Sequence, residues 1–137
     1  MSIEDLCRAW SPRLLSVLRI IIGFLLFVHG STKLFHVPYV EAFAHVQLTS
    51  LGGGIAGMLE FAGGALLLIG LFSRITAFIL SGEMAFAYFL VHAPQGFFPE
   101  VNGGGLAVTY CFALLYLAAA GPGPWSIDSA IRSSRHS

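Results

Sequence analysis

Four apolar segments divide most of the chain, and they constrain its fold more than any other feature. They cover residues 12–35, 55–72, 75–91 and 105–120. A helix that crosses the hydrocarbon core of a bilayer needs about 20 residues, with a range of about 17 to 25. The fourth segment is the shortest and needs flanking glycines to reach that length. We therefore predict an all-α membrane protein, with residues 1–137 folded as one domain: a four-helix transmembrane bundle.

The charge content supports the membrane class. Charged residues make up 10% of the chain and hydrophobic residues 56%, whereas a soluble domain carries roughly 25% charged residues. The formal net charge is zero and there is no basic run, so we expect the lipid bilayer and not a nucleic acid as the surrounding partner.

The first apolar segment begins like a signal peptide, because Arg8 lies shortly before it and Arg13 is at its start. No small-x-small cleavage site follows it, so we expect a retained transmembrane helix. Pro12 suits the first turn of such a helix, with Ser11 as its N-cap.

The links between segments differ in length and character. Only Ser73 and Arg74 separate the second and third segments, which predicts a tight antiparallel hairpin. Residues 38–46 place Tyr39, Phe43 and Val46 at helical spacing, which predicts a short amphipathic helix lying on the outer membrane face. The link from His92 to Gly104 is rich in proline and glycine and predicts a loop.

The arginines gather on one side of this topology. Lys33 lies alone at the other side, and the positive-inside rule then places both termini in the cytoplasm. The arginines on the cytoplasmic side are Arg8, Arg13, Arg74, Arg132 and Arg135.

The two cysteines, Cys7 and Cys111, form no CxxC pair and no zinc-binding spacing. On this topology they lie toward opposite sides of the membrane, so no disulfide within one chain and no metal site is expected.

Two polar residues fall in the cytoplasmic half of the bilayer. At about 1.5 Å per residue, Arg19 lies about 10 Å and Glu83 about 12 Å from the cytoplasmic helix ends. A charge at this depth is costly unless it pairs inside the bundle. We therefore predict a structural ion pair between Arg19 and Glu83, although a functional relay is the alternative.

A second polar group is expected in the outer half. Glu60 lies about 20 Å, and His29 and His92 about 25 Å, from the cytoplasmic side. Lys33 lies at the outer interface. These four residues are the candidate contacts for a ligand or a proton. The simpler alternatives are a protonated, hydrogen-bonded Glu60, histidines that merely end helices, and Lys33 as a topology anchor.

Helical spacing places Glu60 on a packed face and not toward lipid. Glycines recur with it at small-xxx-small spacing, which allows two helix backbones to approach closely. The two predicted stripes are Arg19, Gly23, Leu26, Gly30 and Lys33 in the first helix and Gly53, Gly57, Glu60, Gly64 and Leu67 in the second.

No established catalytic motif is present, so no catalytic residue is assigned. Two histidines at similar depth, His29 and His92, could ligate haem between helices. No second feature supports haem, and we do not expect it.

Four motifs in order give the chain its resemblance to a family. "HGSTKLF", "LEFAGG", "FFPEVNGGG" and "GPGPWSID" together resemble the DoxX family of small bacterial integral membrane proteins. The resemblance implies a four-helix bundle in the bacterial inner membrane. Besides the candidate contacts and the usual arginine of the first helix, the motif positions it marks are Gly30, Gly63, Gly64, Asn102, Gly103 and Asp128.

The family name comes from subunits of a thiosulfate:quinone oxidoreductase. The resemblance therefore implies an accessory or anchor subunit of a quinone-linked membrane redox system, with soluble or membrane redox subunits, or further copies of the chain, as partners. In this hypothesis Glu60, His29 and His92, with Lys33, contact a quinone head group or pass a proton. The alternative is a non-enzymatic small transporter or a scaffold whose buried charges only specify helix packing.

Overall fold

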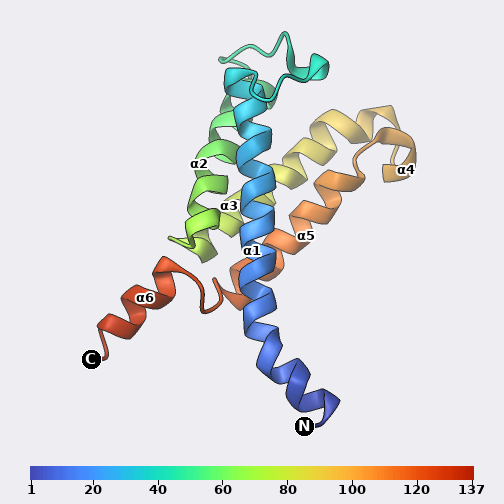
Figure 1. Cartoon of the computed structure of the whole chain (residues 1–137). Helices are drawn as coiled ribbons and strands as arrows, with labels where there is room; N and C mark the ends of the chain where they lie inside the picture. The colour runs from blue at the N-terminus through green and yellow to red at the C-terminus, as the bar shows by residue number, and fades with distance from the viewer.

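The computed structural model describes all residues, 1–137, and its regular secondary structure is entirely helical, without strands. Its six α-helices and four short 3-10 or π segments are shown in Figure 1. In chain order they are α1 (Ile3–Phe35), η1 (Glu41–Phe43), η2 (Leu51–Ile55), α2 (Ala56–Ile69), α3 (Ser73–Ala87), η3 (Tyr88–His92), η4 (Ala93–Gln95), α4 (Pro99–Asn102), α5 (Gly105–Ala120) and α6 (Ile127–Ser134).

Three continuous helical stretches are long and apolar enough to cross a membrane: Ile3–Phe35, Leu51–Ile69 and Ser73–Gln95. They confirm the all-α membrane class. The fourth predicted span is α5, an apolar helix of 16 residues. At 1.5 Å per residue it is about 24 Å long, shorter than the roughly 30 Å hydrocarbon core.

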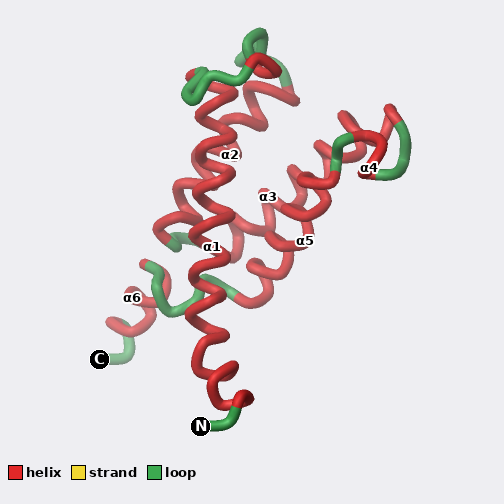
Figure 2. Tube along the Cα trace, turned by 45° about the vertical axis from the view of Figure 1, so that its right-hand side comes forward, coloured by secondary structure: helices red, strands yellow, loops and turns green.

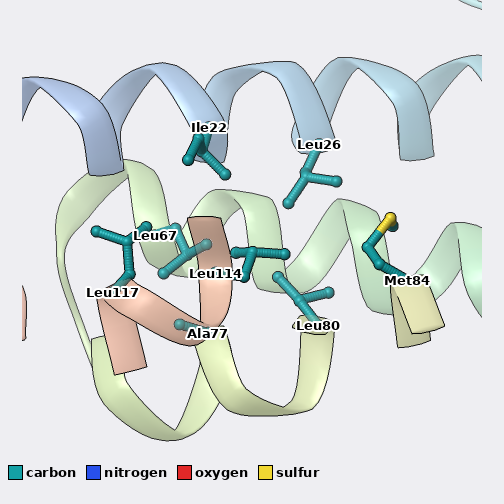
Figure 3. Close-up of a cluster of buried hydrophobic side chains, with 8 residues drawn as sticks. All are labelled: Ile22, Leu26, Leu67, Ala77, Leu80, Met84, Leu114 and Leu117. Carbon is teal, nitrogen blue, oxygen red and sulfur yellow. The ribbon is translucent and has the colours of Figure 1, made fainter. Parts of the chain in front are cut away.

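The four long helices form two pairs, α1 with α2 and α3 with α5. Figures 1 and 2 show the pairs meeting near the end of the molecule where both termini lie, here called the terminal end, and diverging toward the other, the distal end. Where the pairs meet, one buried cluster joins all four helices (Figure 3). Its members are Ile22, Leu26, Leu67, Ala77, Leu80, Met84, Leu114 and Leu117.

Close backbone contact holds α1 against α2. All ten residues of the two predicted glycine stripes are buried, which confirms both faces. A Cβ atom added at Gly64 would lie 2.7 Å from the carbonyl oxygen of Gly23, and one at Gly30 would lie 2.7 Å from that of Gly57. Real Cβ atoms do not approach backbone atoms so closely, so the two helices touch through glycine as small-xxx-small packing requires.

The predicted start of the first helix is wrong. Helix α1 begins at Ile3, and Pro12 lies inside it. Ser2 and Asp5 form a capping box in which each side chain accepts the other residue's backbone N–H at 3.1 Å. This cap satisfies the orphan donors of the first turn and starts the helix upstream of the proline. The first turns therefore project beyond the bundle at the terminal end (Figure 1).

The predicted outer amphipathic helix is also wrong. Residues 38–46 contain only one 3-10 turn, Glu41–Phe43. A segment of this length forms too few hydrogen bonds to offset helix nucleation. Phe43 instead packs its ring edge-on against His29, with centroids 5.1 Å apart.

The hairpin between α2 and α3 is confirmed, but its turn lies earlier than predicted. Gly70 and Phe72 have left-handed backbone angles, φ 72° and 51°, and Ser73 already begins α3. The C-terminal segment then returns to this turn. Helix α6, which we did not predict, follows it.

The prediction of an ion pair between Arg19 and Glu83 is wrong. Arg19 is buried, and its Nη2 donates to the carbonyl oxygen of Trp125 at 2.6 Å. Its guanidinium lies beside Gly70, at the level of the α2–α3 turn. Glu83 follows the first residue of α3 by ten residues, which places it about 15 Å farther along the bundle. Arg19 therefore secures the C-terminal segment and does not pair within the membrane.

Asp128 completes this connection by capping α3. Its two carboxylate oxygens accept the backbone N–H groups of Phe72 and Ser73, each at 2.9 Å. Partial burial raises the pKa of Asp128, but the hydrogen bonds from Ser73 and Phe72 and the charge of Arg19 outweigh it. The pKa therefore lies below its ordinary value.

Asp128→Ala should lower the free energy of unfolding by about 1–2 kcal/mol at pH 7, the usual cost of losing a helix cap. Because the folded-state pKa is depressed, the stabilisation is fully present above the unfolded pKa of about 3.9 and is lost as pH falls through the folded value. Denaturant unfolding in detergent at several pH values measures this, with exposed Glu100→Ala as the control. A deficit that stays constant down to the folded pKa would contradict a charged cap.

Candidate functional site

A cavity of about 830 Å³ lies between the two helix pairs, toward the distal end. Helices α1, α2, α3 and α5 all contribute to its wall, and 14 of its 21 lining residues are hydrophobic. Its volume is within the range of about 300 to 1,000 Å³ typical of small-molecule sites. The six lining residues with ionisable side chains are His29, Lys33, Glu60, Glu83, His92 and Tyr110.

An ion pair between Lys33 and Glu60 forms the inner wall. Lys33 Nζ donates to Glu60 Oε1 at 3.0 Å, and the two residues are 7% and 1% exposed. Lys33 follows Gly30 by one turn on α1, and Glu60 follows Gly57 by one turn on α2. Because the two helices run antiparallel, the pair bridges the Gly30–Gly57 backbone contact, and the glycine stripes bring it together. The ring of Phe43 lies 5.8 Å from Lys33 Nζ and covers it.

His29 lies on the same side of the cavity. Its Nε2 is 4.0 Å from Glu60 Oε2, and its side chain is 39% exposed. This distance is too long for a hydrogen bond. Glu60 Oε2 is buried and has no hydrogen-bond partner. The carboxylate therefore has one satisfied and one unsatisfied oxygen at the cavity.

Glu83 faces this group from α3. Its carboxyl group lines the same cavity as that of Glu60, and its buried Oε2 also lacks a partner. We predicted Glu83 in an inner layer with Arg19, but the structure places it with Glu60 instead. Tyr110, on α5, lines the same cavity and was not predicted as a site residue.

His92 lines the cavity but is held away from the charged group. Only His29 and Lys33 come within ion-pair distance of Glu60. The Nδ1 of His92 lies 3.0 Å from the backbone oxygen of Asn102. The structure thus brings together three of the four predicted contacts and places His92 on another part of the wall.

Asn102 organises the loop that closes the distal end. Its amide nitrogen donates to the carbonyl oxygen of Gly96 at 2.6 Å, and its side-chain oxygen accepts the N–H of Gly104 at 2.8 Å. Tyr88 donates its hydroxyl to the carbonyl of Phe97 in the same loop. These bonds fix the wall that carries His92 and begin α5.

The other family motif positions shape the helix contacts. Gly63 faces Leu80, where an added Cβ would lie 2.8 Å from its Cδ1 atom. Gly103 ends α4 with a left-handed φ of 72° and lines the cavity. Gly30 and Gly64 touch the neighbouring backbone, as described above, and Asp128 caps α3.

The arrangement combines hydrogen-bond donors and acceptors at one end of an apolar space. Lys33 and the Tyr110 hydroxyl are donors, His29 can donate or accept, and the free oxygens of Glu60 and Glu83 are acceptors. Imidazole and carboxyl groups can also exchange protons with a bound molecule. Cys7 and Cys111 are free, and no group of three or more His, Cys, Asp or Glu residues is placed to hold a metal ion.

Comparisons with known proteins agree with the motifs. The family model described as DoxX matches residues 14–93, a range that includes every ionisable cavity residue except Tyr110. A protein of Haemophilus influenzae described as uncharacterized is 38% identical over 130 residues, covering 88% of this chain and 92% of that protein. No solved structure matches.

Proposed function

This chain belongs to the DoxX family, and from that premise we propose that it is an accessory or anchor subunit of a quinone-linked redox system. In this proposal the cavity between the helix pairs binds the quinone head group. The observation that carries it is the combination, in one cavity, of apolar walls with the Lys33–Glu60–His29 group.

The chemistry of a quinone suits this combination. Its ring is apolar and planar, and its two carbonyl oxygens accept hydrogen bonds. Lys33 and protonated His29 can donate to one carbonyl, and Tyr110 can donate to the other. When the quinone is reduced it takes up protons, and carboxyl and imidazole groups are able to supply them.

We further propose that the chain lies in the bacterial inner membrane with both termini in the cytoplasm. Both termini lie at one end of the molecule (Figure 1), and Arg74 and the arginines near the termini belong to that end. The positive-inside rule assigns such an end to the cytoplasm. The cavity then opens in the outer half of the bilayer, and α5 serves as the fourth span.

The electrons for quinone reduction would come from a separate redox protein. A soluble or membrane subunit at the cytoplasmic or outer face is the partner that this role requires, and further copies of the chain could assemble around it. In this assembly the chain binds the quinone and donates protons to it, and the other subunit donates the electrons.

Quinone binding to the purified protein in lipid nanodiscs tests the proposal directly. Glu60→Gln should weaken binding of a short-chain quinone about 10- to 100-fold, because hydrogen bonds that involve charged groups contribute about 1.5–3 kcal/mol. Lys33 loses its 3.0 Å bond to Glu60 in this variant and no longer has a fixed position at the head group. Titration calorimetry with the quinone measures the change.

Two further variants make the result specific. Ala107→Leu narrows the cavity without changing its charge and should also weaken binding, whereas exposed Glu100→Gln should not affect it. If both Glu60→Gln and Ala107→Leu bound quinone with wild-type affinity, the proposal of a quinone site in this cavity would be contradicted. A proton flux into liposomes that Glu60→Gln abolishes, without quinone binding, would favour the transporter alternative.

A further inference from the structure

We propose that Glu60 and Glu83 hold a single proton between their carboxyl groups, which makes this pair a proton-binding site in the cavity wall. The inference deepens the proposed function, because it names the group that supplies a proton to a bound molecule. It does not require the ligand to be a quinone.

Unsatisfied buried atoms point to the proton. Glu60 is 1% exposed, and its Oε2 has no hydrogen-bond partner; Glu83 Oε2 is likewise buried without one. The two carboxyl groups line the same cavity, together with Lys33 and His29. Two carboxylates offer only acceptors, so they can bond only if one carries a proton. One shared proton turns an unfavourable contact into a hydrogen bond.

The count of charges gives the same result. From α1, Lys33 supplies one positive charge 3.0 Å from Glu60. The other ionisable groups that line the cavity are His29 on α1, His92 in η3 and Tyr110 on α5. None of these is a second fixed cation. Two ionised carboxylates beside one ammonium would leave an uncompensated charge in an apolar environment, which is strongly unfavourable. One shared proton makes the group neutral.

The position of the pair lets this proton move. Both residues line the cavity, so the carboxyl O–H can transfer its proton to an acceptor atom of a bound molecule. The O–H bond breaks, a bond from the acceptor atom to the proton forms, and the two carboxylates are left with charges that repel each other. His29, which is 39% exposed and lies 4.0 Å from Glu60 Oε2, then provides a path for a replacement proton from water.

Infrared spectroscopy of the ligand-free protein in nanodiscs at pH 7 tests the shared proton. Wild-type protein should show a carbonyl band of a protonated carboxyl group that shifts in heavy water. Glu60→Gln and Glu83→Gln should each abolish the whole band, because each leaves one carboxylate in the cavity, whose charge the Lys33 ammonium balances without a bound proton. The remaining acidic side chains are exposed or, in Asp128, bound as a carboxylate, and exposed Glu100→Gln should leave the band unchanged.

Each other outcome would overturn the proposal. Absence of the band in the wild type shows two ionised carboxylates, and stabilisation by sodium in that case shows a bound cation in place of the proton. A band that survives in one of the two single variants shows a protonated residue and not a shared proton. Gln is nearly isosteric with Glu, and if either variant fails to fold, Glu60→Asp and Glu83→Asp take its place: each draws one carboxyl group away from the other, so both should shift the band of a shared proton, whereas the band of a proton held by one residue responds mainly to the variant at that residue. The infrared measurement uses no quinone, so it tests the shared proton even if the chain is found not to bind quinone.

Discussion

Lys33→Met should destabilise the protein more than any other single change in the cavity, by about 3–5 kcal/mol at neutral pH. Removing one partner of a buried ion pair leaves the other charge uncompensated, and losses of this size are typical. Glu60 is 1% exposed and has no second cation within ion-pair distance except His29, when that residue is protonated. The free energy of unfolding in mixed detergent micelles measures the loss.

A double variant distinguishes the effect of the lysine's charge on stability from the effect of its packing. Lys33→Met with Glu60→Gln removes both charges, and it should recover most of the lost stability because no buried charge remains. The two effects should therefore be strongly non-additive. An additive double variant, or a loss below about 1 kcal/mol as for a surface pair, would show that the ion pair is not buried in the membrane.

Gly64→Ile should lower the free energy of unfolding by about 3 kcal/mol, at the upper end of what overpacking costs. An added Cβ would lie 2.7 Å from the Gly23 carbonyl oxygen, and backbone cannot move aside as a flexible side chain can. The two helices would have to separate. Since Lys33 and Glu60 are on these same helix faces, the separation should also lengthen their ion pair and weaken ligand binding in the cavity.

Gly82 provides the matched control on another helix. It is exposed on α3, and an added Cβ would meet no atom within 4 Å. Gly82→Ala should be neutral or stabilise by up to about 1 kcal/mol, the difference in helix propensity. Equal losses at Gly64 and Gly82 would show that the glycines matter for something other than close helix contact.

The parts of the fold that depend on one helix at a time could be predicted from the sequence. Hydropathy locates the apolar helices, and the spacing of glycine with Glu60 and Lys33 identifies the faces that pack. Both signals are local, because they follow from the 3.6-residue period of a single helix. The contact of α1 with α2, and with it the Lys33–Glu60 pair, follows from matching two such faces.

The parts that depend on how two pairs of helices are placed could not be predicted. Depth counted from helix ends puts Arg19 level with Glu83, but it ignores the C-terminal segment, which offers Arg19 the carbonyl of Trp125 instead. The inward face of α5 could not be read, because that helix is apolar on every side, so Tyr110 carried no signal. The 3-10 turn at Phe43 depends on contacts with His29 and Lys33 that no local pattern contains.

The short length of α5 has a consequence for the surrounding lipid. As the proposed fourth span, an apolar helix of about 24 Å is shorter than a hydrocarbon layer of roughly 30 Å, so the bilayer should thin locally around it. Helix α1, on the opposite side, is long enough to tilt. The lipid around the protein is therefore expected to be asymmetric, thinner along the α3–α5 pair that carries Glu83 and Tyr110. A thinner layer shortens the distance between water and the wall of the cavity on that side.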